Sequence, residues 1–146
     1  MFAASVSSRM DDADRVAATV RRVLESRPVV LGVLFGSYAR GTAGSHSDVD
    51  VAVVFEPSVD DRLGARLDLG VELSLAFGTD DIDVVDLADV RPAVGYSALE
   101  QGRLLVGDPG RAEKLTAEFD SERERTTDQD RRERFDAALE RLEELV

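Results

Sequence analysis

Two short runs of β-branched and apolar residues constrain this fold more than any other feature of the sequence. The first run, VVLGVLF at residues 29–35, lies between Pro28 and Gly36, and these bounds together with its composition predict a buried strand. The second run, DVDVAVVF at residues 48–55, predicts another strand, which stops at the Glu-Pro pair that follows it. The chain therefore has to build a sheet around two strands that a small polar segment connects.

Helical spacing dominates the segments before and after these strands. Residues 11–27 place valine and leucine at helical intervals, with aspartates near the start and arginines near the end, as the helix dipole prefers. Pro28 then ends this predicted helix. Residues 60–77 carry one apolar stripe with a period of four, and Gly78 closes the predicted helix. The stripe consists of Leu63, Leu67, Val71 and Leu75.

Short elements and polar helices are expected in the second half of the chain. The short elements are strands at residues 81–87 and 103–107 and a helix at residues 93–101. Two C-terminal helices follow, and the sequence Thr126-Thr127-Asp128 predicts a stop and a new N-cap between them. The apolar stripe at residues 135–146 is equally consistent with folding back on the core and with docking a partner helix.

The order of these elements indicates the fold class. A chain ordered helix, strand, strand, helix, strand and then helices predicts a mixed α/β (α+β) fold, in which helices flank a small sheet. At 146 residues it is long enough to bury a core unaided. We expect residues 1–108 to form the main domain and residues 109–146 to form a C-terminal helical extension.

Composition narrows the classes of function. The formal net charge of −12 and the lack of a basic stripe argue against direct binding of nucleic acid, and they leave room for a basic protein partner. No apolar run reaches the length of a membrane helix, so we expect no membrane association. The chain has no cysteine, which is compatible with a reducing compartment, and we expect a cytoplasmic protein.

Two aspartates lie on one side of the second strand. Because side chains alternate along a strand, Asp48 and Asp50 point to one face, about 7 Å apart, while the intervening valine points to the other. Such carboxylates repel each other unless a cation lies near them, and Mg²⁺ is commonly held by one or two carboxylates together with substrate phosphates. The alternative is that the two aspartates are simply solvent-exposed side chains on the face of an edge strand and bind no cation.

The turn before the aspartates suits a phosphate. Gly36 allows the backbone to come close to a ligand, and Ser37 offers a hydroxyl and an amide at the start of a possible helix. Together with the two aspartates, this turn predicts a site for a metal ion and a nucleotide.

The spacing of these residues is that of a known family. Gly36-Ser37, ten intervening residues and then Asp48-Val49-Asp50 resemble the signature of the polymerase-β-like nucleotidyltransferase superfamily. The stretch GSYARGTAGSHSDVDVAVV is similar to its minimal nucleotidyltransferase (MNT) branch, and the resemblance covers more than half the chain. It implies the polymerase-β-like fold, with residues 1–108 as the nucleotidyltransferase domain.

The resemblance also implies roles for single residues. A third carboxylate of the family falls on Asp83, although Asp80, Asp81 and Asp86 lie close by and only the family pattern selects Asp83. Asp48, Asp50 and Asp83 would hold two Mg²⁺ ions, and Asp83 would also help to deprotonate the acceptor hydroxyl. Gly36 and Ser37 would hold the outer phosphates of the triphosphate. Arg40 would either pair with a phosphate or brace the loop.

Two other residues near this motif have plain interpretations. His46 lies in the loop before Asp48, and a solvated loop position is favoured over a role as a ligand. Tyr96 is favoured as a packing residue over a base-stacking one, although it belongs to the region that would border the site.

Chains of this size resemble the antitoxins of HEPN/MNT toxin-antitoxin modules. That resemblance implies an enzyme that transfers AMP from ATP to a tyrosine of a HEPN-domain ribonuclease toxin and thereby neutralises the toxin. Two alternatives stay open. The chain could be an antitoxin that acts by binding alone, or a nucleotidyltransferase that modifies a small-molecule hydroxyl such as that of an aminoglycoside.

Overall fold

The computed structural model describes residues 3–36 and 48–144, and within them the chain folds around one mixed sheet. The four strands are β1 (Val29–Phe35), β2 (Val49–Phe55), β3 (Ile82–Asp86) and β4 (Arg103–Val106). Their order in the sheet is β3-β2-β1-β4. β1 is antiparallel to both of its neighbours, whereas β2 and β3 are parallel. The strands expected at residues 29–35 and 48–55 therefore pair with each other.

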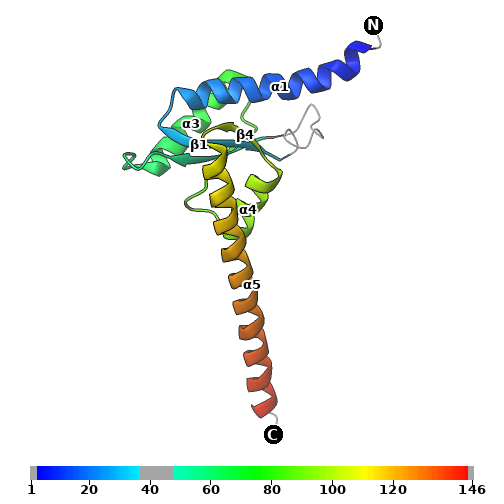
Figure 1. Cartoon of the computed structure of the whole chain (residues 1–146), viewed down its shortest axis with the longest axis vertical. Helices are drawn as coiled ribbons and strands as arrows, with labels where there is room; N and C mark the ends of the chain where they lie inside the picture. Colours follow the sequence, from blue (N-terminus) through cyan, green and yellow to red (C-terminus); the bar gives the residue numbers. More distant parts are fainter. Residues whose placement is uncertain (1–2, 37–47, 145–146) are drawn as a thin grey trace.

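Helices cover both faces of this sheet (Figure 1). They are α1 (Ala3–Glu25), α3 (Arg62–Phe77), α4 (Pro92–Gln101) and α5 (Pro109–Glu144). α1 and α3 pack on one face, and α4 and the first part of α5 pack on the other. In the parts of the chain that the structure describes, no helix has both the length and the apolar character needed to cross a membrane.

Two apolar cores result, one on each face. The first core joins Leu24 of α1 and Leu69 of α3 to alternate residues of β2, such as Val51. The second core joins Leu31 and Ala52 of the sheet to Ala98 and Phe119 of the two other helices, in a cluster of buried side chains. The mixed α/β fold expected from the sequence, in which helices flank a small sheet, is confirmed. The division at residue 108 stays a prediction.

α1 begins earlier than expected. The helix predicted at residues 11–27 starts at Ala3 and ends at Glu25, shortly before Pro28. The added segment, AASVSSRM, contains neither proline nor glycine, so nothing in it stops a helix from extending toward the N-terminus.

The predicted break near residue 126 is wrong, because α5 is one continuous helix. Thr126 donates its hydroxyl hydrogen to the Glu122 carbonyl at 2.9 Å, and Thr127 donates to the Arg123 carbonyl at 2.9 Å. These bonds to the preceding turn satisfy the hydroxyls inside a helix, so they do not cap a new one. The second half of α5 projects away from the sheet (Figure 1), and its apolar side chains do not fold back on the core.

α3 ends as expected but presents its predicted stripe to solvent. Asp61 caps its N-terminus by accepting a hydrogen bond from the Gly64 amide at 2.9 Å, and Gly78 caps its C-terminus with a φ of +67°. The side chains that α3 buries are Leu69 and Leu73. The exposed fractions of Leu63, Leu67, Val71 and Leu75 are 59%, 59%, 60% and 79%.

We predict that two leucines of α3 that are two positions apart, Leu67 and Leu69, differ sharply in their effect on stability. Leu69→Ala empties a fully buried position and is expected to lower the free energy of unfolding by about 2–5 kcal/mol. Leu67→Ala removes a side chain that is more than half exposed and is expected to change it by no more than about 0.5 kcal/mol. Urea denaturation of both variants at low protein concentration measures the difference. Equal losses would contradict the assignment of the buried row.

Candidate active site

The sheet topology gathers the motif residues at one end of the central strands. β1 runs antiparallel to β2, so Phe35 at the end of β1 pairs with Asp50 at the start of β2. β2 runs parallel to β3, so Asp50 also lies beside Asp83. Gly36, Asp50 and Asp83 therefore meet at the same edge of the sheet, although Gly36 and Asp83 are far apart in the sequence.

The carboxylates share one face of the sheet. Asp50 and Asp83 are direct neighbours on strands that lie about 4.8 Å apart. Asp48 precedes β2 by one residue and, by the alternation of side chains, belongs to the face of Asp50. Asp48 and Asp83 are exposed and Asp50 is half-buried. The neighbouring valines of β2 are buried in the first core, on the opposite face.

Gly36 lies against the carboxylate of Asp50. Its φ is +76°, a backbone conformation that other residues rarely adopt. A Cβ atom at this position would lie 2.2 Å from Oδ2 of Asp50, closer than any real contact. The glycine is therefore required by the close approach of the turn to a carboxylate of the site, in addition to any ligand.

Several motif residues lie outside the described residues. These are Ser37, Arg40 and His46, so their expected roles stay predictions.

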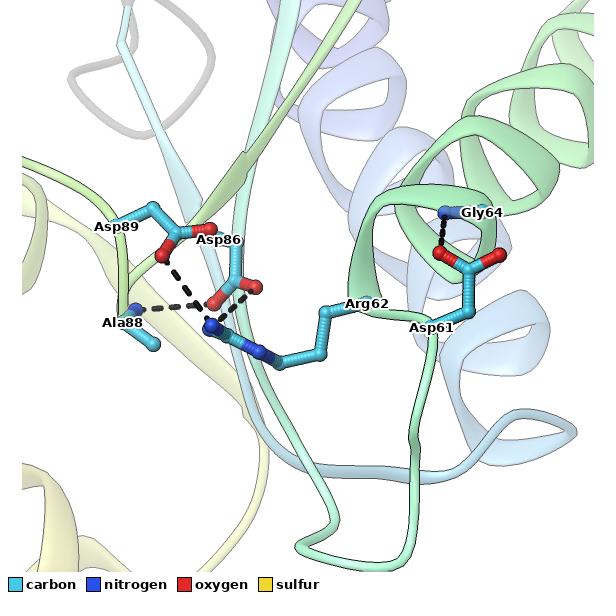
Figure 2. A network of polar contacts seen from close by, with 6 residues as sticks. All are labelled: Asp61, Arg62, Gly64, Asp86, Ala88 and Asp89. Carbon is cyan, nitrogen blue, oxygen red and sulfur yellow. Dashed lines mark hydrogen bonds and ion pairs between the residues drawn. The ribbon is translucent and has the colours of Figure 1, made fainter.

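The other candidates for the third carboxylate have different surroundings. Asp86 lies on the opposite face of β3, where its side chain is only 4% exposed. Figure 2 shows its Oδ2 bound by Arg62 of α3 at 3.1 Å, while its Oδ1 accepts a hydrogen bond from the Ala88 amide at 2.9 Å. Arg62 also reaches the exposed Asp89 at 3.3 Å. Asp86 therefore ties β3 to α3 and does not face the site.

Asp80 and Asp81 precede β3 and are both exposed. Their carbonyls accept hydrogen bonds from Ile82 and Val49, at 2.8 and 2.9 Å. Continuing the parallel register by one step places Asp81 beside Asp48. Asp83 is the carboxylate that stands next to Asp50, and Asp81 is the remaining alternative.

The carboxylates fit a magnesium ion that arrives with a nucleotide. Among residues 3–36 and 48–144, no group of three or more acidic, histidine or cysteine side chains is arranged to hold a metal by itself. Mg²⁺ usually takes only one or two carboxylates and completes its shell with phosphate oxygens and water. Two neighbouring carboxylates such as Asp50 and Asp83 suit that mode of binding better than a closed protein cage.

The side chain of Tyr96 packs against its neighbours in the protein. The ring is half-buried against the second core, and the Arg123 guanidinium lies over it at 4.0 Å from the ring centroid. Arg123 also pairs with Asp120 at 2.7 Å. Burial opposes the charge of Arg123, but the hydrogen bond and charge of Asp120, together with Tyr96, raise its pKa above the ordinary value. These contacts favour a structural role for Tyr96.

A cavity of about 460 Å³ lies at the other end of the sheet. It is lined by the start of β1, the end of β2 and the first turns of α5, including Val30, Phe55 and Arg111. The carboxylates are at the opposite ends of these strands, so this cavity is separate from the candidate site.

Comparison with known proteins identifies the family that this chain matches. Residues 19–109 match the family described as polymerase beta, nucleotidyltransferase. The protein adenylyltransferase MntA of Shewanella oneidensis is 36% identical over 74 residues, which are 51% of this chain and 51% of that relative. The chain thus matches about half the length of this curated relative.

Two solved structures share the architecture. A crystal structure of a toxin-antitoxin with AMP-PNP is similar with a TM-score of 0.68 and 26% identity, over 84% of this chain and 98% of that one. A structure of the tri-AMPylated HEPN toxin of Shewanella oneidensis in complex with the MNT antitoxin is similar with a TM-score of 0.64 and 23% identity, over 87% and 98%. At this lower identity the likeness shows the shared fold.

We predict that the two acidic partners of Arg62 contribute unequally to stability. Asp86→Ala removes a buried carboxylate and the acceptor of the Ala88 amide, so the free energy of unfolding is expected to fall by about 1–3 kcal/mol. Asp89→Ala removes an exposed ion pair worth no more than about 1 kcal/mol. Thermal and urea unfolding measure both. A larger loss for Asp89→Ala would refute the structural role of Asp86.

Proposed function

The chain belongs to the polymerase beta nucleotidyltransferase family, and from this membership we propose that it transfers AMP from ATP to a tyrosine hydroxyl of a partner HEPN-domain ribonuclease toxin. The modification would neutralise the toxin, and the chain would act as its antitoxin. The observation that carries this proposal is the placement of Asp50 beside Asp83 at the sheet edge, with Gly36 against Asp50.

Similarity to characterised proteins supports the choice of nucleotide and acceptor. The relative with 36% identity is named a protein adenylyltransferase, which transfers AMP to a protein. The similar structure with 26% identity is a toxin-antitoxin that holds AMP-PNP, an analogue of ATP. The AMPylated HEPN toxin of the other structure illustrates the product that we expect. We place the reaction in the cytoplasm, because ATP is supplied there and because a chain without cysteine is compatible with a reducing compartment.

The chemistry is a displacement at the α-phosphorus of ATP. The tyrosine oxygen forms a new bond to this phosphorus, the bond to the bridging β-oxygen breaks, and pyrophosphate leaves. Gly36 and Ser37 would orient the β- and γ-phosphates, and Arg40 would either pair with them or brace the loop. Asp83 would accept the proton of the tyrosine hydroxyl, because its exposed carboxylate stands at the open edge of the sheet.

Asp48, Asp50 and Asp83 are the residues that would hold Mg²⁺. When bound there with ATP, two such ions supply positive charge that neutralises the attacking and leaving oxygens. The side chains themselves would set the geometry of the reaction. The strand register holds Asp50 next to Asp83, and the turn at Gly36, which lies against Asp50, would bring the triphosphate close to both carboxylates.

The acidic surface suits a protein acceptor of opposite charge. The net charge of −12 favours a basic partner and disfavours RNA as the acceptor. A tyrosine on a basic helical protein is therefore favoured over the end of a nucleic acid.

We predict that Asp50→Asn abolishes the transfer. The protein is incubated with ATP, Mg²⁺ and the HEPN toxin, and the intact masses of both chains are measured. The wild-type protein is expected to add AMP units to the toxin, and Asp50→Asn is expected to slow this by at least about a thousandfold, since several kcal/mol of charge stabilisation are lost. Asp60→Asn, which removes the same charge from an exposed position just before α3, serves as the matched control.

Other outcomes would replace the proposal. If the two chains co-purify and no triphosphate adds mass to the toxin, neutralisation by binding alone becomes the better account. If an aminoglycoside gains mass and the toxin does not, the acceptor is a small-molecule hydroxyl.

We predict that the transfer depends on a divalent cation. Excess EDTA is expected to stop the addition of AMP, and an excess of Mg²⁺ over the chelator is expected to restore it, because the carboxylates bind the triphosphate only through a cation. The same mass measurement follows both steps. Full activity in EDTA would overturn the metal site and leave the transfer itself in place.

A further inference from the structure

α3 carries two apolar rows on nearly opposite sides. One row, Ala65, Leu69, Leu73 and Phe77, belongs to the first core. The other row, Leu63, Leu67, Val71 and Leu75, is exposed, and we call it the outer ridge. Because each helical residue turns by about 100°, the two rows lie about 160° apart. A helix that is apolar on opposite sides is normally covered on both.

The outer ridge is a continuous row with a spacing of four residues. Such rows pack into the grooves of a second helix, and two helices that both use their rows of this type cross at about −50°. At that crossing the two rows run parallel, so all four side chains of the ridge can touch the second helix. The groove beside the ridge is shallow at Gly70 and Ser74, which lets another helix approach.

The charges beside the outer ridge balance each other. Arg66 lies on one flank and Asp68 on the other, and within the described residues neither has an ion pair. Glu72, on the flank of Asp68, is already neutralised by Arg27 of the same chain. The surface around the outer ridge is therefore nearly neutral despite the net charge of −12. A strongly basic partner would find no excess of acidic side chains around the ridge.

We infer that the outer ridge of α3 is the interface of a symmetric dimer, in which the second copy of this chain covers it. A two-fold interface brings the same patch together from both copies, and identical ridges have the same inclination by construction. Each ridge then fills the shallow groove of the other, and the four exposed side chains of both copies leave water.

The flanking charges select a parallel arrangement of the two helices. In a parallel two-fold contact, opposite flanks meet, so Arg66 of each copy faces Asp68 of the other. In an antiparallel contact, each flank meets itself, so Asp68 of one copy lies on the same side of the contact as Asp68 of the other. Opposite charges attract in the first arrangement and like charges approach in the second, so the parallel dimer is favoured.

This interface leaves the candidate active site accessible. α3 packs on the face of the first core, whereas Asp50 and Asp83 belong to the opposite face, where α4 and α5 pack. A dimer through α3 therefore presents two sites outward and can engage two partner molecules at once.

Analytical ultracentrifugation of the full chain, without ATP or toxin, tests the interface. The wild type is expected to change from monomer to dimer as its concentration rises, and Leu67→Glu is expected to weaken the dimer at least about a hundredfold. Leu142→Glu is the matched control, because Leu142 is a leucine of α5 with an exposed fraction of 60%. Circular dichroism checks that both variants fold.

Salt dependence distinguishes the second copy from a basic partner. The two Arg66–Asp68 pairs flank the interface at the surface, where an ion pair contributes little, so screening of the repulsion between two chains of charge −12 is expected to dominate and to tighten the dimer as salt is added. Binding of a basic protein to the ridge would instead weaken with salt. A wild type that stays monomeric at every concentration and salt level overturns the dimer, as does dissociation by Leu142→Glu with no effect of Leu67→Glu.

Cross-linking tests the orientation, since the natural chain has no cysteine. In the parallel dimer, Leu63→Cys alone and Leu75→Cys alone are each expected to form an intermolecular disulfide under mild oxidation. An antiparallel dimer would give the disulfide only when the two variants are mixed. That result would overturn the parallel arrangement, and no disulfide in any sample would overturn the interface.

Discussion

The pairing of β2 with both of its neighbours is the constraint on which the rest of the structure depends. Its antiparallel pairing with β1 returns the chain to the edge where Gly36 ends the first strand, and its parallel pairing with β3 brings Asp83 to Asp50. The alternating side chains of β2 also supply both cores, because Val51 packs under α1 and α3 while Ala52 packs under α4 and α5. A slip of one residue would exchange these faces and bury the carboxylates.

Alternation of side chains along β3 places a proposed catalytic carboxylate and a structural carboxylate on opposite faces of one short strand. Asp83 faces the open edge and stays exposed, whereas Asp86 faces α3 and is buried with Arg62. A buried carboxylate needs its partners, since taking it out of water without them is costly. Arg62 and the Ala88 amide meet that need, and they fix the strand on which Asp83 is presented. The structural carboxylate thus positions the strand that carries the proposed catalytic one.

The helices carry more apolar surface than this single chain buries. α3 covers the first core with one row and exposes another, and α5 continues well beyond the sheet with Phe135, Leu139 and Leu142 in solvent. These surfaces lie away from the edge that holds the carboxylates. The proposed modification of another protein would need room for contacts beyond the active site, and the part of α5 that projects beyond the sheet leaves such room (Figure 1).

Local patterns in the sequence determined the strand at residues 29–35, the second strand to within one residue, the end of α3 at Gly78 and the motif that joins Gly36 to Asp48 and Asp50. These features depend on neighbours in the chain, so they can be inferred without a structure. Tertiary structure alone decided which aspartate stands beside Asp50, which row of α3 is buried, and that α5 runs through Thr126 without a break. Those outcomes depend on strand register and on contacts between distant segments, and a periodic apolar row does not show which side of a helix the sheet will cover.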